Sequence, residues 1–423
     1  MSGTRVDVLV VGAGPAGLAA ATAAAMRGCR VVVVDQAPRP GGQIWRHRDG
    51  EPAPARAMTA IDAATKAGAT FAARASVIDT DGPGRLLIDF DGHVEELQTS
   101  ALVLATGAVE RLLPFPGWTL PGVVGVGGLQ ALVKAGLSLA GTRVVLSGTG
   151  PLLLPVAATA ARSGATLTVL EQQPFTRVAG FGLRAIASDP ARLGDLVAYR
   201  AAARSAAWHH DVWALRAEGT KRVERAVLRI GARELTVACD WLGAASGLVP
   251  RTDLARLLGC TLASDAIAVD ARQATSIPGV WAAGECTGVK GDAAGAIEGM
   301  IAGACSAGDD APSRKLARAN ASGRAFARRM AATFAPRDEL RARVTPDTII
   351  CRCEDVRAGA LGDGWTTRQA KLWSRAGMGV CQGTVCGFVG TSRPPLGTPH
   401  LGAWAAQLAS PTTSPSGGMH DSR

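Results

Sequence analysis

The sequence predicts an α/β protein with two Rossmann-like dinucleotide-binding domains and a small helical, cysteine-containing module near the C-terminus. Three observations predict this fold class. A glycine-rich turn joins two hydrophobic runs near the N-terminus, the same pattern recurs after Gly141, and four of the 9 cysteines fall within the 36 residues from Cys351 to Cys386. The glycine-rich turns indicate nucleotide binding, and the cysteines indicate a separate site.

The composition is that of an ordinary soluble globular protein. Hydrophobic residues make up 47% of the 423 residues and charged residues 19%, and this length allows two or three domains, each with its own core. The net charge is +10, but the basic residues are scattered among Ala and Gly and form no run interleaved with aromatic residues. Nucleic-acid binding is therefore not expected.

The first element, "VDVLVVGAGPAGLAAATAAAM" after Arg5, is nearly all apolar and could be mistaken for a signal peptide. Asp7 and the regularly placed glycines fit a buried strand, a turn and a helix better. Five cysteines lie outside the C-terminal group and the total is odd, which favours a reducing compartment. We therefore expect a cytoplasmic chain without a transmembrane segment, and a peripheral contact with a membrane stays open.

The first nucleotide-binding unit runs from this strand to Asp35. Gly12 permits the tight turn, Gly14 lets the backbone approach a pyrophosphate, and Gly17 lets the helix pack closely on the strand. The start of the helix then faces the phosphates with the positive end of its dipole. Asp35, followed by Gln36, ends the second strand 23 residues after Gly12 and is placed to accept hydrogen bonds from a ribose. These residues predict a dinucleotide site.

A second unit repeats the pattern in "TRVVLSGTGPLLLPVAATAARSGATLTVLEQ", with Gly148, Gly150 and Glu171. The interval from Gly148 to Glu171 is again 23 residues, which indicates an internal repeat of the fold. Leu153 stands where the first copy has its third glycine, and its side chain is expected to push the helix from the strand. We interpret this unit as a nucleotide fold that has lost its nucleotide. If it binds one, Glu171 favours NAD over NADP, because a carboxylate repels a 2′-phosphate.

Three segments resemble the flavoproteins with two dinucleotide domains that include the pyridine nucleotide-disulphide reductases: "GGQIWR" at 41–46, "ALVLATGAVER" at 101–111 and "IPGVWAAGECTG" at 277–288. In that family the first copy binds FAD, and the third segment returns the chain to the FAD domain. The resemblance implies that FAD is also contacted by Gly42, Gln43, Thr106, Gly107, Gly284 and Glu285. The family usually has Asp at the position of Glu285, so the carboxylate is kept but has a longer reach.

One departure from that family concerns the mechanism. A disulphide reductase needs a redox-active cysteine pair beside the flavin, but no cysteine lies in residues 36–110 and the sequence contains no C-x-x-C. Disulphide reductase chemistry is therefore not expected. Cys286, beside Glu285, is interpreted as a small buried filler. The sequence offers no constellation of a general base and a nucleophile, so no residue is predicted to be catalytic.

A closer resemblance covers nearly the whole chain. Residues 107–130, residues 247–260 and the four-cysteine C-terminus are similar to the alpha (A) subunits of heteromeric amino- and imino-acid dehydrogenases. That group includes opine dehydrogenases or oxidases, hydroxyproline dehydrogenase and hydrogen cyanide synthase. The resemblance implies a partner, an FAD-dependent subunit similar to amino-acid oxidases, which performs the C–N oxidation. A small third subunit and an FMN at the subunit interface stay open.

The four C-terminal cysteines fall into two pairs. Cys351 and Cys353 can point to one side, while Cys381 and Cys386 lie in a glycine-rich stretch that can fold closely around an inorganic core. Four thiolates held by short loops suit either zinc or an iron-sulphur cluster, and the spacing alone does not decide between them. The arrangement resembles the bacterioferritin-associated ferredoxin-like domain, which implies a [2Fe-2S] cluster. Zinc and a set of cysteines without metal are the alternatives.

These segments predict the domain organisation. We expect an FAD domain in two parts at 1–115 and 241–310, with the second dinucleotide-binding-like domain between them at 116–240. An Arg-rich helical linker at 311–345, expected to present a solvated face, leads to the [2Fe-2S] module at 346–398. Residues 399–423 are rich in Ser, Pro, Gly and Thr and are expected to form a flexible tail.

The favoured function is that of the flavin- and [2Fe-2S]-containing electron-transfer subunit of a heteromeric dehydrogenase. Its substrate is expected to be an opine, hydroxyproline or a similar amino or imino acid. A self-sufficient NAD(P)H-dependent flavoprotein reductase of a ferredoxin or another acceptor is the alternative, and Leu153 counts against it. An iron-sulphur sensor or scaffold without turnover is the third hypothesis.

Overall fold

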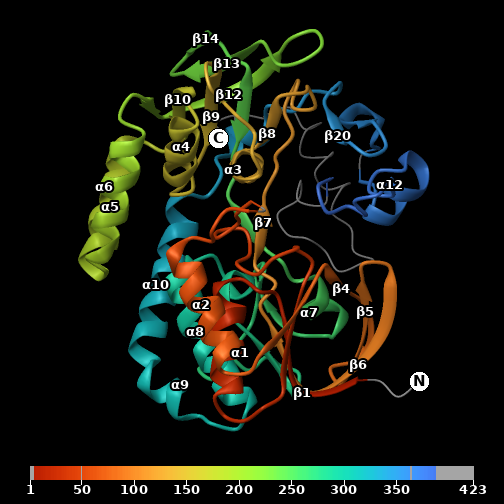
Figure 1. Ribbon diagram of the computed structural model, residues 1–423. Coiled ribbons are helices and arrows are strands. Elements are labelled where there is room, and N and C mark those ends of the chain that lie inside the picture. Colours follow the sequence, from red (N-terminus) through yellow and green to blue (C-terminus); the bar gives the residue numbers. More distant parts are fainter. Residues whose placement is uncertain (1–3, 49, 363, 387–423) are drawn as a thin grey trace, which may run out of the picture.

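The computed structural model describes residues 4–48, 50–362 and 364–386, and in Figure 1 two α/β domains lie one above the other with a small cysteine-containing module at one side. The chain builds part of the lower domain, crosses to the upper one and then returns to complete the lower one. Residues 387–398 of the expected cluster module, and the expected tail at 399–423, lie outside the described residues.

The first domain contains a seven-stranded sheet in the order β3-β2-β1-β6-β5-β4, with β19 also paired to β6. Its strands are β1 (Thr4–Val11), β2 (Val31–Asp35), β3 (Thr70–Ala73), β4 (Ala75–Gly82), β5 (Arg85–Phe90), β6 (His93–Leu104) and β19 (Val280–Ala282). The strands β1, β2, β3, β6 and β19 are parallel, while β4 and β5 continue the sheet as an antiparallel ribbon. Because β19 pairs with the second half of β6, it carries the returning chain to the same sheet edge at which β1 ends.

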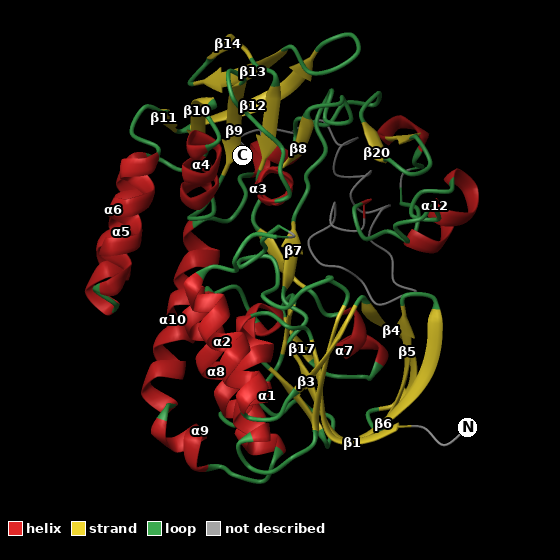
Figure 2. Cartoon of the chain, in the orientation of Figure 1, coloured by secondary structure: helices red, strands yellow, loops and turns green. Residues whose placement is uncertain are grey.

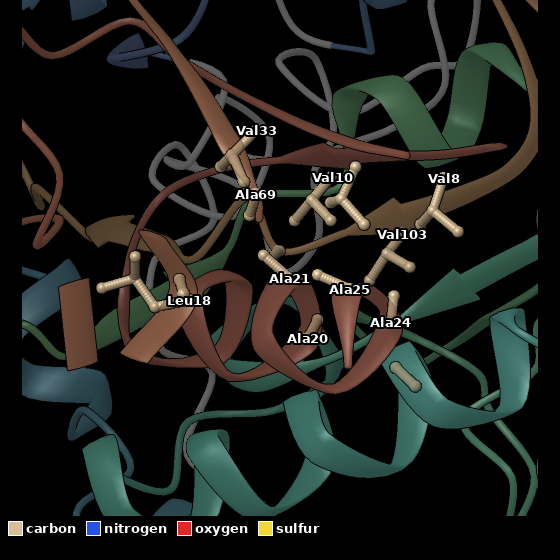
Figure 3. Close-up of a cluster of buried hydrophobic side chains, with 14 of the residues drawn as sticks. Val8, Val10, Leu18, Ala20, Ala21, Ala24, Ala25, Val33, Ala69 and Val103 are labelled. Carbon is tan, nitrogen blue, oxygen red and sulfur yellow. The ribbon is translucent and has the colours of Figure 1, made fainter. Parts of the chain in front are cut away.

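Both faces of the parallel strands are buried, which explains their nearly continuous hydrophobic runs. Val8 and Val10 of β1 belong to the core that faces α1 (Pro15–Ala25), whereas Leu9 belongs to the core on the opposite face. Figure 3 shows these two valines, together with Val103 of β6, on the side of the sheet that faces the alanines of α1.

Two further helices cover α1, namely α2 (Ala55–Lys66) and α8 (Asp292–Ser306). A side chain at Gly299 of α8 would overlap the carbonyl oxygen of Ala16, and one at Gly303 would overlap that of Ala20. The small residues therefore let the two helix backbones touch. Among the helices of the described residues, none is both long and apolar enough for a membrane crossing.

The second domain contains a parallel five-stranded sheet in the order β11-β10-β9-β15-β8. Its elements are β8 (Val123–Gly125), α3 (Val126–Lys134), β9 (Arg143–Gly148), α4 (Leu153–Arg162), β10 (Thr166–Glu171), α5 (Phe175–Ser188), α6 (Ala191–Ala202), β11 (Ala207–His210), β15 (Trp241–Ala244) and the antiparallel sheet of β12 (Val212–Glu218), β13 (Arg225–Ile230) and β14 (Arg233–Ala238). Since β15 lies in this sheet, the second domain reaches Ala244, past the boundary expected at 240.

A two-stranded antiparallel ribbon of β7 (Ala108–Glu110) and β16 (Leu248–Pro250) carries the chain between the domains. At the end of β7, the Glu110 carboxylate accepts hydrogen bonds from the backbone N–H groups of Gly127 and Gly128 in α3, at 2.6 and 2.8 Å. The ribbon is thereby fixed to the second domain. The returning chain then forms α7 (Asp253–Leu257), β17 (Leu262–Ala263), β18 (Ala266–Ile267) and, after β19, the 3-10 helix η1 (Gly284–Thr287).

The linker forms α9 (Ala311–Lys315), α10 (Ala317–Thr333) and α11 (Asp338–Arg341), and Figure 2 shows α10 running alongside both domains. The expected solvated face is only one side of α10. On its other side Phe326 packs against Phe181 of α5, with ring centroids 5.4 Å apart, and Gly323 lies against Ala294 of α8. The linker therefore joins the two domains by its own packing.

The cysteine-containing module follows as β20 (Ile349–Cys351), β21 (Val356–Arg357), η2 (Ala358–Ala360) and α12 (Thr367–Ser374). The indole N–H of Trp118, in the second domain, donates to the carbonyl of Ile349 at 2.6 Å. Val385 packs against the core of the same domain. The module thus contacts the second domain next to Cys351 and again next to Cys386.

Candidate cofactor sites

The glycine turn of the first domain needs two of its three predicted glycines for the fold itself. Gly12 has a φ of +108°, and a side chain there would run into the carbonyl oxygen of Ala105. A side chain at Gly17 would overlap the carbonyl oxygen of Gly12. Both positions therefore accept only glycine, as the tight turn and the close packing of helix on strand require.

Gly14 is different, because the protein itself leaves room for a side chain there. Its backbone, with φ −76° and ψ −175°, suits any residue, and a Cβ would approach only the Cα of Gly42, at 4.0 Å. Gly14 is also the N-cap of α1, a helix that no side chain of the described residues caps. The space beside Gly14 thus adjoins uncapped N–H groups at the positive end of a helix, which suits a pyrophosphate.

The "GGQIWR" loop and Asp35 lie beside this turn. Gly41 donates its N–H to the carbonyl of Ala13 at 2.8 Å. Gly42 has a φ of +60°, and a Cβ there would lie 3.0 Å from the Cα of Gly14. The Asp35 carboxylate accepts from the N–H of Ala13 at 2.6 Å and from the N–H of Ala37 at 2.7 Å. Asp35 therefore braces the glycine turn, and it remains half-buried at the end of β2.

Two of the predicted FAD contacts are exposed glutamines. Gln36 lines an open hollow of about 490 Å³ together with Pro38 and Arg74. Gln43 lies on the loop beside the glycine turn. Because both side chains are exposed, each has room to turn toward a ligand.

Gly284 brings the returning chain to the same place. It has a φ of +85°, and a Cβ there would lie 2.7 Å from the Cβ of Ala16 in the first turn of α1. The neighbouring Glu285 directs its carboxylate to the start of α8, where it accepts from the N–H groups of Gly291 at 2.7 Å and Lys290 at 3.2 Å. Burial raises the pKa of Glu285, while these two N–H donors oppose the rise. Glu285 thus braces the loop that leads into α8, beside the glycine turn.

Thr106 and Gly107 follow β6 at the crossing between the domains. Thr106 donates its hydroxyl to the carbonyl of Arg251 at 2.7 Å, and the carbonyl of Gly107 accepts from the N–H of Arg251 at 2.9 Å. The backbone nitrogen of Thr106 lies near the turn at Gly12. The glycine turn, Gly42, Thr106 and Gly284 are therefore gathered around the start of α1, and this cradle fits a dinucleotide.

Sequence reasoning missed a buried ion pair beneath this cradle. The ammonium group of Lys290 lies 2.8 Å from both carboxylate oxygens of Glu298, and both side chains are 1% exposed. The Glu298 carboxylate also accepts from the N–H of Gly284 at 3.0 Å and from the hydroxyl of Thr287 at 2.8 Å. The signal was present, since Glu298 is the only acid in the interior of an otherwise small and apolar helix, α8.

The four cysteines of the module come together as two thiol pairs. Cys353 contacts Cys381, and Cys351 contacts Cys386. The N–H of Gly377 points at the Cys351 sulphur, 3.4 Å away, and a side chain at Gly379 would overlap Cys353. All 9 cysteines are free thiols, and no group of three or more His, Cys, Asp or Glu side chains among the described residues converges as a metal site would require.

The two thiols of the glycine-rich stretch differ in their surroundings. Burial alone would raise the pKa of Cys381, but the backbone N–H groups of Val385, Gly383 and Thr384, with the Cys353 thiol, outweigh burial and lower it. Burial, followed by the neighbouring thiols, raises the pKa of Cys386 to about 12. Backbone donors therefore surround the Cys381 thiol, whereas the Cys386 thiol is buried in the core of the module itself.

The second glycine turn is built like the first but begins its helix later. Glu171 accepts from the N–H groups of Gly150 and Gln173, both at 2.9 Å, much as Asp35 braces the first turn. Leu153 is buried in the core of the second domain, and α4 starts five residues after Gly148, where α1 starts three residues after Gly12. The late start gives Leu153 room under the helix, so it does not push helix and strand apart. Burial raises the pKa of Glu171, against the opposing effect of its N–H donors.

The comparisons with known proteins agree with this architecture. The family model for pyridine nucleotide-disulphide oxidoreductases matches residues 6–308. The A subunit of opine oxidase from Agrobacterium tumefaciens is 32% identical over 422 residues, which cover 90% of this chain and 84% of that protein. The HcnB subunit of hydrogen cyanide synthase from Pseudomonas aeruginosa is 33% identical over 89% of this chain and 90% of its own length.

A solved structure matches nearly the whole chain. L-proline dehydrogenase from P. horikoshii superimposes with a TM-score of 0.63 and covers 96% of this chain and 74% of its own. The sequence identity is 18%, so this likeness concerns the fold alone.

Proposed function

This chain belongs to the pyridine nucleotide-disulphide oxidoreductase family, in the group that includes the A subunit of opine oxidase, and we propose from that premise that it transfers electrons within a heteromeric dehydrogenase. The complex would oxidise an opine, hydroxyproline or a similar amino or imino acid. The relatives described above are themselves subunits of opine oxidase and of hydrogen cyanide synthase. The alpha subunit of sarcosine oxidase is similar to 43% of this chain. The chain itself is a flavin-dependent oxidoreductase subunit.

The open space at Gly14 is the observation that carries the proposal. Gly12 and Gly17 are needed by the fold, but the fold makes no such demand at Gly14, so a ligand is the reason to keep glycine there. FAD would lie with its pyrophosphate at this turn and its ribose toward Asp35, with Gly284 and Glu285 toward the ribitol. Bound FAD supplies a two-electron acceptor. The residues of this chain hold it, and the buried pair of Lys290 and Glu298 supports the turn from beneath.

The paired cysteines support a [2Fe-2S] cluster as the exit for single electrons. A two-iron cluster takes two thiolates on each iron, and the chain offers its thiols as two adjacent pairs. The glycines at 377 and 379 let the backbone approach the sulphurs. Zinc would use the same donors but could not carry electrons from a flavin.

We infer a partner chain as well. A catalytic FAD-dependent subunit similar to amino-acid oxidases would perform the C–N oxidation, with a small third subunit and an interface FMN as further members. A cytoplasmic location belongs to the same proposal. The self-sufficient NAD(P)H reductase has less support, because the second dinucleotide turn is covered by the linker.

The deciding experiment compares two electron donors. The chain is purified anaerobically, alone and together with the inferred amino-acid-oxidase-like partner subunit, and the flavin absorbance is followed after mixing. We expect reduction by an opine or by hydroxyproline in the complex only, and no reduction of the isolated chain by NADH within seconds. Rapid bleaching of the isolated chain by NADH would instead establish the reductase.

A further inference from the structure

We propose that Arg324 and Asn320 of the linker helix α10 are positioning residues for the flavin, because they hold the turn at Gly284 through two buried side chains of the first domain. The linker is thereby part of the FAD site, and FAD binding and the docking of α10 stabilise each other. This role rests on the FAD cradle proposed above, and the experiment below separates a failure of the cradle from a failure of the linker contact.

Gln273 is a strained and fully buried residue beside the returning strand β19. It has a φ of +61°, a left-handed conformation that is uncommon outside glycine, and its exposed fraction is 0%. Its backbone carbonyl accepts from the N–H of Ala282, the last residue of β19, at 3.0 Å. Such a conformation persists only where the surrounding contacts enforce it. Here the contacts lie on the strand that leads into the flavin turn.

The side chain of Gln273 joins β19 to the linker. In the amide orientation that satisfies its neighbours, it donates to the carbonyl of Ala282 at 3.0 Å. Its amide oxygen then accepts from Nη2 of Arg324 at 3.3 Å and from Nδ2 of Asn320 at 3.1 Å. Asn320 is also buried, with 6% of its surface exposed. A buried amide that meets these three partners together fixes the position of α10 relative to β19.

The second group that holds the turn is the Glu298 carboxylate. One of its oxygens accepts from the N–H of Gly284 at 3.0 Å, and Nε of Arg324 lies 4.0 Å from the other. At 4.0 Å this contact is an attraction between opposite charges and not a hydrogen bond. The Arg324 guanidinium therefore reaches both side chains that hold the turn, Gln273 at Ala282 and Glu298 two residues later.

Arg324 is itself held by backbone carbonyls of the loop that contains Gln273. Its Nη2 donates to the carbonyl of Asp270 at 2.7 Å, and its Nη1 donates to that of Val269 at 3.5 Å. The side chain is 32% exposed, so it lies at the edge of the buried network. A guanidinium presents several N–H donors in one plane, which lets a single side chain contact the loop, the amide and the carboxylate together.

The close approach of α10 is set one residue before Arg324. A Cβ at Gly323 would lie 2.9 Å from the Cβ of Ala294 in α8, so the two helices touch at this point. Glu298 follows Ala294 by one turn of α8. The helix crossing that places Arg324 beside Glu298 therefore has no room for a side chain. Gly323→Leu would lift α10 from the network without removing any of its polar groups.

The coupling between FAD and α10 acts in both directions. The cradle is complete only when the turn at Gly284 is in place, and α10 helps to position the two groups that hold this turn. A ligand that prefers one arrangement of the protein stabilises that arrangement by the same factor. Bound FAD should therefore slow the local opening of α10, and loss of the Arg324 contacts should weaken FAD binding about fivefold or more.

The test uses the full-length protein purified with its flavin. FAD release is followed by the rise in flavin fluorescence after dilution into buffer without flavin, and urea unfolding is measured for the flavin-loaded and the flavin-free protein. In R324M, FAD should leave about fivefold or more faster than in wild type. The urea midpoint should fall more for the loaded than for the free protein, because the lost free energy belongs to FAD binding. Gly323→Leu should behave like R324M.

Arg328, exposed on the same helix, gives the matched control, and R328M should release FAD as wild type does. Equal FAD release in R324M and wild type overturns the role of the linker alone. An equal fall of both urea midpoints also overturns it, since a contact that only supports the fold acts on both forms alike. A wild-type chain that binds no FAD overturns the cradle and the role of the linker together.

A second measurement needs no variant and decides the matter if R324M does not fold. Amide hydrogen exchange of residues 317–333 is compared in the wild-type protein with FAD bound and after its removal. Exchange in α10 should be slower with FAD, whereas exchange in β13, in the antiparallel sheet of the second domain, should not change. Equal exchange of α10 in the two forms overturns the proposal, and so does an equal slowing of α10 and β13.

Discussion

Lys290 and Glu298 form an ion pair beneath the turn that carries Gly284 and Glu285, with the ammonium nitrogen 2.8 Å from both carboxylate oxygens. Both side chains are 1% exposed. The pair is anchored to the turn on two sides, because Lys290 also donates to Thr287 at 2.7 Å and Glu298 accepts from the N–H of Gly284 at 3.0 Å. The position of the turn at the start of α1 thus depends on two charges in the interior.

Removing one member of this pair should be costly. Lys290→Met removes the cation that contacts both oxygens of the buried Glu298 carboxylate and leaves it only the Arg324 guanidinium, 4.0 Å away and partly exposed. We therefore expect a loss of about 3 kcal/mol in the free energy of unfolding. Urea unfolding of the flavin-loaded chain measures it.

The double variant K290M/E298Q is the matched control. It removes both charges, and the amide oxygen of Gln can still accept from the N–H of Gly284. It should recover most of the lost stability. A K290M protein as stable as wild type would show that the pair contributes nothing.

Gly14→Val should abolish FAD binding without unfolding the protein. The backbone at Gly14 suits a valine, and its Cβ would approach only the Cα of Gly42, at 4.0 Å, so the group that we expect the side chain to displace is the pyrophosphate. Flavin absorbance per chain gives the loss, and circular dichroism tests the fold. Gly12→Val is the contrasting variant, because it strikes the backbone of Ala105 and should lower the yield of folded protein. An unchanged flavin content in Gly14→Val would contradict the placement of the FAD pyrophosphate at this turn.

Cys381→Ser should remove most of the iron while leaving FAD in place. Wild-type protein prepared anaerobically should hold about two irons and two sulphides per chain. Cys381 lies in the module, away from the cradle at α1, so flavin content should not change. Cys29→Ser, a half-buried thiol of the first domain, is the control and should keep its iron. One zinc per chain without sulphide would contradict the electron-transfer role of the module.

Asp240→Asn should weaken the second domain in a pH-dependent manner. Arg143 donates to the Asp240 carboxylate from Nη2 at 2.9 Å, and this side chain with its backbone N–H lowers the pKa of Asp240 to about 2. Because the folded pKa lies below the unfolded value, the carboxylate stabilises the fold above about pH 4, and the benefit fades as the pH falls toward about 2. The pair is partly exposed and screened, so the expected loss at neutral pH is about 0.5 kcal/mol.

The difference in urea midpoint between wild type and D240N should therefore shrink as the pH falls from about 4 to about 2. The exposed Asp62 on α2 gives the control, since D62N should have the same urea midpoint as wild type at every pH in this range. A D240N penalty that stays constant with pH would mean that the charge of Asp240 is not its cause.

The sequence was sufficient for the parts of the fold that depend on neighbours in the chain. The turn at Gly12, the small-residue helix after it and the strand ending at Asp35 form one local unit, so their spacing predicted the arrangement seen in β1, α1 and β2. The repeat at Gly148 was predicted on the same ground. The family resemblance was confirmed by relatives that are 30–33% identical.

The rest depends on contacts between segments far apart in the sequence. No local sequence pattern around Gln172 predicts that its side-chain amide donates to the carbonyl of Ala335, 163 residues later. The expectation that Leu153 would part helix from strand was wrong, because the chain starts α4 later and takes the side chain into the core. The boundary expected at 240 missed β15, whose four residues are too few to show a period.

The crossing of α8 over α1 also sets an order for protein synthesis. The alanines of α1 leave the ribosome early, but the glycines that cover them, such as Gly299 against Ala16, are made 283 residues later. The strands of the second domain's parallel sheet, from Val123 to Ala244, are all complete before then. The second domain can therefore fold before the flavin cradle is complete. In nascent chains arrested before α8, the second domain should already be folded and no flavin should be bound.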